Sequence, residues 1–200
     1  MTLPEHAICS LMVAQLAGQE RLGLRGVICV VVAGICPDID TATKLFGESY
    51  FWRMHHALGH NVLSVMIISA AIACAGSRCG RLSNGRYLFA WCMTAAVLHC
   101  LTDSLYWWGI QPFWPLAGVE VCLNVIEYLD LFVLAIWLVP AVLLYAYYDR
   151  ARQIAICTLA TFIVYVALRA ALPPPTGILH LITGGWMYAV PNGTPVLDWW

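Results

Sequence analysis

The sequence predicts an all-α protein, a polytopic membrane bundle of about six helices of which the first two are short. Composition is the first observation behind this prediction, because 62% of the residues are hydrophobic and only 10% are charged. A soluble domain usually has about 45–50% apolar and about 25% charged residues. The second observation is that the apolar residues gather in long runs, which makes the chain an integral membrane protein.

Two short apolar stretches come first, at about 7–20 and 24–36, and the QERLG sequence between them favours an antiparallel pair. Each stretch is only about 20 Å long at about 1.5 Å per residue, so each is either a short span or half of a hairpin that dips into the membrane. Longer stretches follow at about 61–76, 86–108, 129–148 and 153–172. Their lengths suit a transmembrane helix, which needs about 17–25 mostly apolar residues.

The tail from Pro173 is expected to lie at the membrane interface. It carries a PPP run, several glycines and an aromatic end, and Trp and Tyr favour the headgroup level. With this tail, residues 1–200 are interpreted as a single membrane-embedded domain. The nine cysteines lie mostly inside apolar runs and form no CxxC pair, which favours packing residues over a disulfide framework.

Basic residues divide unevenly between the two sides if every apolar stretch crosses the membrane. One side collects Arg21, Arg25, Arg78, Arg81, Arg86, Arg150 and Arg152, and the other collects Lys44 and Arg53, with Arg169 near a helix end. Short basic loops tend to stay in the cytoplasm. We therefore expect a multi-pass membrane protein whose second side faces outward, which is the periplasm if the cell is a Gram-negative bacterium. The net charge of -1 gives no sign of nucleic-acid binding.

Three polar clusters fall on the outward side of this topology. They are CPDID at 36–40 with His6 across the hairpin, HHALGH at 55–60, and HCLTD at 99–103. His99 and Asp103 are four residues apart, so they share one face of a helix. Ionisable groups at membrane depth are costly when unpaired, so we expect these groups to pair with one another and to serve a function.

Each cluster also has a purely structural explanation. Pro37 can end the apolar run, and Asp38 can cap the next helical turn. His99 and Asp103 can form a hydrogen-bonded pair between helices, and the HHALGH loop can be a pH-sensitive interfacial loop. Because the topology brings all three clusters to one face, a shared site is the stronger interpretation.

A shared site built from His and Asp, with no Cys at a ligand spacing, suits a divalent cation: Zn, with Mn or Fe as alternatives. The candidate ligands outnumber those of one tetrahedral site, so two or more ions can be accommodated. Two ions about 3.5–4 Å apart suit the hydrolysis of phosphate esters, because they polarise the phosphoryl oxygen and lower the pKa of a bound water.

These motifs resemble those of a known family, the membrane-bound metal-dependent hydrolases that include LexA-binding, inner-membrane-associated hydrolases. The resemblance runs in order through His6, PDID at 37–40, HHALGHN at 55–61, HCLTD at 99–103 and DSLYWWGIQPFWPL at 103–116. It covers residues 6–116 and leaves the helices and tail of 117–200 as additions. That family is similar to the zinc-dependent phospholipase C and P1 nuclease superfamily, which implies a phosphoesterase-like hydrolase.

Carried over residue by residue, the resemblance implies a set of metal-site residues and, within it, catalytic residues. The metal-site residues are His6, Asp38, Asp40, His55, His60, His99 and Asp103, and the catalytic residues are Asp38, His60 and Asp103. His56 stands where the family has Arg, and Gly59 where Thr is usual. The guanidinium group of that Arg is a planar fork suited to binding phosphate. Here His56 can take its place as a weaker donor to phosphate, and Arg53 is another candidate for this role.

The resulting hypothesis is a multi-pass metal-dependent hydrolase of the bacterial inner membrane. Its site would lie at the outward-facing interface between this membrane and water. Its expected substrate is a phosphoester on a lipid or lipid-linked molecule, and membrane lipids are its expected surroundings. A metal-ion transporter or channel that uses the same residues is the main alternative, although transport sites usually lie near the midplane, often in internally repeated halves. A non-catalytic scaffold with a fully ligated structural metal is another alternative.

Overall fold

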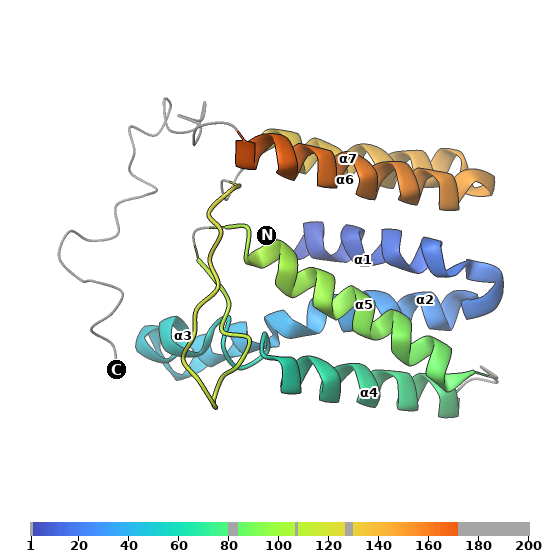
Figure 1. Ribbon diagram of the computed structural model, residues 1–200. Helices are drawn as coiled ribbons and strands as arrows, with labels where there is room; N and C mark the ends of the chain where they lie inside the picture. The colour runs from blue at the N-terminus through green and yellow to red at the C-terminus, as the bar shows by residue number, and fades with distance from the viewer. Residues whose placement is uncertain (1, 80–83, 107, 127–129, 172–200) are drawn as a thin grey trace.

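Helices lie side by side along one direction in the computed structural model, and a non-helical segment crosses one end of them (Figure 1). The structure describes residues 2–79, 84–106, 108–126 and 130–171. Within these ranges the only β-type pairing is an isolated antiparallel bridge between Ile110 and Val121. The predicted all-α class is therefore confirmed.

Six longer helices correspond to the six apolar stretches of the sequence. They are α1 (Leu3–Ala17), α2 (Gln19–Ile35), α4 (Val62–Cys79), α5 (Gly85–Asp103), α6 (Leu131–Ala146) and α7 (Ala151–Ala171). A 3₁₀ helix, η1 (Cys36–Phe46), and a short helix, α3 (Glu48–Met54), connect α2 to α4, and a 3₁₀ turn, η2 (Tyr148–Arg150), connects α6 to α7. The sequence did not predict η1 or α3.

The α1–α2 hairpin forms as expected, and α2 is kinked at Gly23, so that its continuous part begins where the second apolar run begins. The backbone N–H of Thr2 donates to Glu5 Oε2 at 2.7 Å, and this capping box starts α1 before the apolar run begins. Gly18 and Gly23 have φ values of 85° and 62°, which glycine adopts without a steric penalty. They bound the tight reversal where the QERLG connection was expected.

Helix α5 ends at Asp103, earlier than the 86–108 stretch suggests. The next residues pair with a distant segment instead of continuing the helix: Leu123 N–H donates to Ser104 O, and Val125 N–H donates to Leu105 O, both at 2.7 Å. These bonds satisfy backbone groups that would otherwise lack partners beyond the helix end. Residues 104–106 and 108–126 therefore cover the end of the bundle at which α5 finishes (Figure 1).

The core lies between α1, α2 and α5, with α4 and the α6–α7 pair packed outside them. Small and branched side chains such as Ala14, Val30 and Ala95 are fully buried at the first contact. Met12 of α1 packs with Trp137 and Phe162 of the α6–α7 pair. This packing holds the starts of α1 and η1 and the end of α5 at the same end of the molecule.

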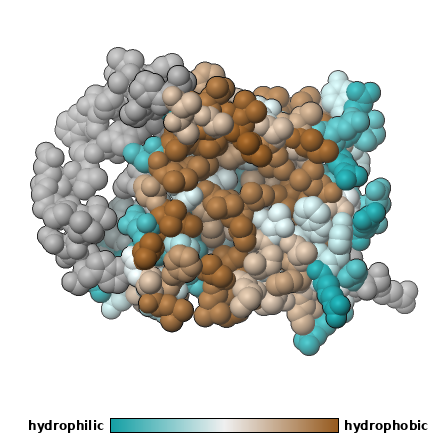
Figure 2. Space-filling model, viewed as in Figure 1, coloured by the Kyte–Doolittle hydropathy of each residue, from teal (hydrophilic) through white to brown (hydrophobic). Residues whose placement is uncertain are grey.

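On the face shown in Figure 2, apolar residues cover the middle of the bundle and polar residues lie toward its ends. Among the described residues, two helical segments are long and apolar enough to cross a membrane: Gln19–Phe46, which is α2 with η1, and Tyr148–Ala171, which is η2 with α7. Val62–Arg78 and Leu131–Ala146 are shorter apolar helices. The exposed side chains of these helices include Val139 and Val142 of α6 and Ile163 and Val164 of α7. These features agree with the predicted membrane helical bundle.

Connections between the longer helices alternate between the two ends (Figure 1). The α1–α2, α4–α5 and α6–α7 connections share one end, where Arg21, Arg25, Arg86, Arg150 and Arg152 lie in or beside them. The opposite end carries η1, α3 and the segment after α5. This alternation is the chain geometry that the topology prediction assumed, although Arg81 and the tail from Pro173 lie outside the described residues.

Candidate metal centre

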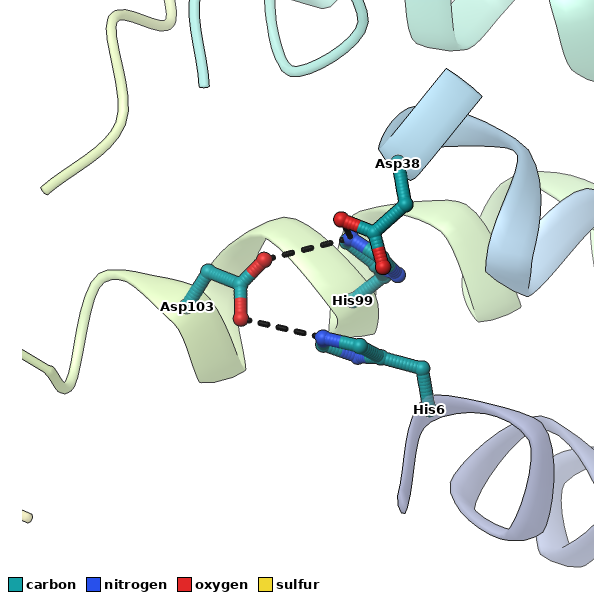
Figure 3. A group of neighbouring side chains, drawn as sticks. All are labelled: His6, Asp38, His99 and Asp103. Atoms are coloured by element: carbon teal, nitrogen blue, oxygen red, sulfur yellow. Dashed lines mark ion pairs between the residues drawn. The ribbon is translucent and has the colours of Figure 1, made fainter. Parts of the chain in front are cut away.

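Four side chains from three separate elements meet at the end of the bundle that carries η1 (Figure 3). His6 comes from the first turn of α1, Asp38 from the first turn of η1, and His99 and Asp103 from the last turns of α5. One ligand atom from each lies within 4.8 Å of the others. The structure therefore places together residues from two of the three clusters that the sequence singled out.

The histidine-rich loop, HHALGH at 55–60, contributes to a second group of possible metal ligands, which includes the same two carboxylates. His56 and His60 join Asp38 and Asp103, again with ligand atoms within 4.8 Å of one another. His60 Nε2 lies 3.2 Å from Asp103 Oδ2 and 3.1 Å from His99 Nε2. All three sequence clusters thus converge on one place.

Hydrogen bonds at the far side of each ring determine which nitrogen faces the cluster. His99 Nδ1 donates to the carbonyl oxygen of Gly34 at 2.6 Å. His60 Nδ1 lies 3.0 Å from Asp40 Oδ2, and a carboxylate is likewise an acceptor. In their neutral forms, both rings therefore turn a lone pair on Nε2 toward Asp38 and Asp103. A carboxylate or carbonyl behind a histidine is the usual support of a metal-binding imidazole.

The interior of the cluster therefore brings acceptors face to face. His99 Nε2 lies 3.2 Å from Asp103 Oδ2 and 3.5 Å from Asp38 Oδ1. His6 Nε2 lies 3.0 Å from Asp103 Oδ1, yet neither nitrogen of this buried ring has hydrogen-bond geometry to any partner among the described residues. Acceptors that converge in a buried space need a proton or a cation between them, so this donor set fits a divalent metal ion.

Burial and charge separate the pKa values of the two loop histidines. Burial lowers the pKa of His56 to about 3, so this ring is neutral at neutral pH. Burial also acts to lower the pKa of His60, but hydrogen bonds and charge from Asp103 and Asp40 outweigh it and raise the pKa to about 9. In the metal-free protein, His60 therefore holds a proton where the acceptors converge.

Asp40 and His55, two of the seven predicted metal-site residues, lie outside both four-residue groups. Asp40 instead supports the histidine loop: its Oδ1 lies 2.7 Å from His55 Nδ1, and its Oδ2 accepts from the backbone N–H of His56 and of Gly59 at 3.0 and 3.3 Å. A 3₁₀ helix has about three residues per turn, so Asp38 and Asp40 project in different directions.

His56 is the site residue whose position the sequence reasoning missed. It was interpreted as a replacement for a phosphate-binding arginine, whereas its Nε2 lies 3.9 Å from Asp103 Oδ2. Its Nδ1 donates to the carbonyl oxygens of Trp108 and Gly109, both at 3.1 Å. No signal within HHALGH distinguishes its two adjacent histidines, because their environments come from η1 and from the segment after α5. Arg53 is exposed on α3.

Comparison with known proteins yields a family and one relative. A sequence model of the YdjM inner membrane protein family matches residues 1–174, which supports the predicted inner-membrane location. The uncharacterized protein YfhP of Bacillus subtilis strain 168 is 27% identical over 128 residues, which are 60% of this chain and 39% of YfhP. The chain thus spans about two fifths of that relative, and no solved structure matches. Because the family match extends over most of its length, the chain belongs to the YdjM inner membrane protein family.

Proposed function

We propose that the protein is a membrane-bound metal-dependent hydrolase that cleaves a phosphoester on a lipid or lipid-linked substrate. The observation that carries this proposal is the convergence of histidine lone pairs and two carboxylates in a buried cluster. A bound divalent cation, Zn with Mn or Fe as alternatives, would supply electrophilic polarisation of the phosphoryl group and activation of water. The similarity to phospholipase C and P1-type nucleases stays a prediction.

Uneven burial of the cluster favours a reactive centre over a structural one. The side chains of His6, His99 and Asp103 are each 1% exposed, whereas that of Asp38 is 16% exposed. A structural metal is enclosed by protein ligands, but a catalytic metal keeps a position open to water or substrate. The centre is closed toward the core and open on the side of Asp38, which is where a substrate would approach.

Exposed apolar and aromatic side chains on η1, which carries Asp38, and on α3, which follows it, support a lipid substrate. Leu45 and Phe46 of η1 and Tyr50 and Trp52 of α3 are exposed. Trp52 stacks on Trp108 with ring centroids 4.6 Å apart. Trp and Tyr favour the headgroup level of a bilayer, so this end of the bundle is suited to a substrate whose reactive group lies at the membrane interface.

The three proposed catalytic residues have distinct positions in the cluster. Asp38 lies at the opening and Asp103 at the centre. His60 lies between Asp40 and Asp103, with a carboxylate near each ring nitrogen. This arrangement lets His60 hold a proton or release it when its Nε2 lone pair is needed. Asp40 supports that exchange because it stabilises the protonated ring.

Placement along the bundle argues against the metal-carrier alternative. The cluster lies where α1 starts and α5 ends, at one end of the helices rather than midway along them (Figure 1). Transport sites usually lie near the membrane midplane on interrupted helices. An interfacial position is what a hydrolase of lipid-linked substrates requires.

The test uses the full chain, purified in detergent and supplied with Zn, Mn or Fe, on a panel of lipid and soluble phosphoesters. We expect metal-dependent cleavage of at least one substrate. Asp38→Ala and Asp103→Asn should each lower turnover by roughly 100-fold or more, because even residues that support metal ligands are worth about 10–100-fold. Asp149→Ala is the matched control, since Asp149 is exposed in η2 at the opposite end.

Full activity in both site variants, with a substrate that the unaltered protein cleaves, would rule out the assignment. Circular dichroism and size-exclusion profiles should show that the variants remain folded. Metal uptake by proteoliposomes without cleavage of any substrate would favour the carrier instead.

A further inference from the structure

Six side chains approach the centre, which is more than one tetrahedral ion uses. The group with His6 and His99 and the group with His56 and His60 share only Asp38 and Asp103. Each group on its own offers four ligands, and each contains two histidines and two carboxylates. The two groups thus have the composition of two adjacent cation sites with common carboxylates.

Asp103 contacts histidines of both groups. In the first group its Oδ1 lies 3.0 Å from His6 Nε2 and its Oδ2 lies 3.2 Å from His99 Nε2. In the second group the same Oδ2 lies 3.2 Å from His60 Nε2 and 3.9 Å from His56 Nε2. A carboxylate whose oxygens contact the histidines of two ligand sets is placed to bridge them. We propose that the centre holds two divalent cations, that Asp103 bridges them, and that His56 and His60 bind the second.

This inference rests on the metal centre of the proposed function and assigns His56 to it. The position of His56 is determined on three sides: its backbone N–H donates to Asp40 Oδ2, its carbonyl accepts from Gln111 N–H, both at 3.0 Å, and its Nδ1 donates to two backbone carbonyls. With Nδ1 protonated, the neutral ring has its lone pair on Nε2, which is the atom nearest Asp103.

The backbone at His56 supports a functional reason for this placement. Its φ of 65° lies in the left-handed region, which is uncommon for a residue with a side chain. Such conformations persist where the surroundings enforce them, and they cluster at functional sites. Here the contacts of the backbone and of Nδ1 enforce it, and the result is that Nε2 points toward the shared carboxylates.

Charge balance agrees with two cations and an anionic substrate. Asp38, Asp40 and Asp103 contact the histidines of the cluster and contribute three negative charges. One divalent cation would leave this group negative, which would repel a phosphate. Two divalent cations make it positive, which favours a phosphoester at the open side of the centre.

The experiment counts bound metal in the full-length protein after equilibration with Zn(II), by elemental analysis. We expect two equivalents in the unaltered chain and one in His56→Asn. Asparagine tolerates a positive φ and keeps an amide donor near the position of Nδ1, but it lacks Nε2. Leu58→Asn is the matched control, because Leu58 belongs to the same loop, has an exposed side chain and lies outside both groups; it should retain two equivalents.

A second readout detects the pair of ions directly. With Mn(II) in place of Zn(II), two bridged ions should give an exchange-coupled electron paramagnetic resonance spectrum, and His56→Asn should give the six-line signal of isolated ions.

One equivalent of metal in both the unaltered protein and His56→Asn would overturn this inference and leave the single-metal hydrolase intact. Loss of an ion from Leu58→Asn as well would assign the effect to the loop and would also overturn the inference. No bound metal in the unaltered protein would refute the proposed function itself.

Discussion

At His60, a proton and a metal ion compete for the same ring nitrogen, Nε2. Its Nδ1 lies 3.0 Å from Asp40 Oδ2 and its Nε2 3.2 Å from Asp103 Oδ2, so each ring nitrogen faces a carboxylate. Burial opposes protonation of the ring, but these contacts outweigh it and raise the pKa to about 9. A proton on Nε2 occupies the lone pair that a cation would use.

Metal affinity should therefore depend on pH above neutrality. Below about pH 9, His60 is protonated in the metal-free protein, so a cation must displace that proton, and its apparent affinity should rise about tenfold per pH unit between pH 7 and pH 9. Above pH 9 this dependence should end. Isothermal titration calorimetry with Zn(II), in buffers of different ionisation enthalpy, measures both the affinity and the proton released.

Asp40→Asn is the informative comparison for this prediction. It removes one of the two charges that raise the pKa of His60, so the rise in affinity should end at a lower pH. An affinity that does not change between pH 7 and pH 9 in the unaltered protein would show that His60 does not bind the metal.

Close approach between elements depends on two glycines. A Cβ on Gly34 of α2 would lie 1.8 Å from Ser10 Oγ of α1, and a Cβ on Gly59 would lie 1.9 Å from the carbonyl oxygen of Pro37 in η1. Gly34 also accepts the hydrogen bond from His99 Nδ1. The helix hairpin and the histidine loop can therefore reach the centre only because these positions lack side chains.

Gly59→Ala should weaken metal binding more than it disrupts the fold. The clash is with backbone, which no side-chain rotation can relieve, so the loop must move away from η1 and carry His56 and His60 away from Asp38. We expect a loss of about 1–3 kcal/mol in unfolding free energy, as for other overpacked sites, together with at least one lost metal equivalent. Thermal unfolding and metal analysis measure the two effects.

Gly85→Ala is the control for this substitution. A Cβ there would come within 3.0 Å of Ser77 Oγ only, which is the end of a small side chain at the opposite end of the bundle. Its metal content should equal that of the unaltered protein. Normal metal binding in Gly59→Ala would mean that the loop tolerates displacement from η1 and that the glycine is not required for the centre.

The molecule as a whole separates its chemistry from most of its basic residues. The His/Asp cluster lies at the end with η1 and α3, and the other end carries Arg21, Arg25, Arg86, Arg150 and Arg152. An apolar surface lies between the two ends (Figure 2). By the tendency of short basic loops to stay in the cytoplasm, the cluster would face outward.

This orientation can be tested with single cysteines placed at Lys44 of η1 and at Asp149 of η2, in a background without the native cysteines. Both side chains are well exposed, at 59% and 79%. In intact cells, a membrane-impermeant maleimide should label Lys44→Cys, and it should label Asp149→Cys only after the membrane is permeabilised. Labelling of both positions in intact cells would show that the two ends lie on the same side, and the reverse pattern would invert the orientation.

Sequence alone was sufficient for the six longer helices and for the general location of the site. Long apolar runs separated by polar connections leave few alternatives to packed helices in a membrane, because every backbone group must find a partner within the segment. The i, i+4 spacing of His99 and Asp103 placed both on one face of α5. Antiparallel connections then required their end of α5 to lie near the start of α1.

Tertiary contacts were needed for the identity of the ligands. Asp38 and Asp40 are equivalent in the sequence, and so are His55 and His56, but packing turns Asp38 and His56 into the cluster and Asp40 and His55 away from it. The reason is physical: ring orientation depends on carbonyls at Gly34, Trp108 and Gly109, which come from distant segments. The local sequence specifies which side chains are available as metal ligands. The packing of distant segments decides which of their atoms face the metal centre.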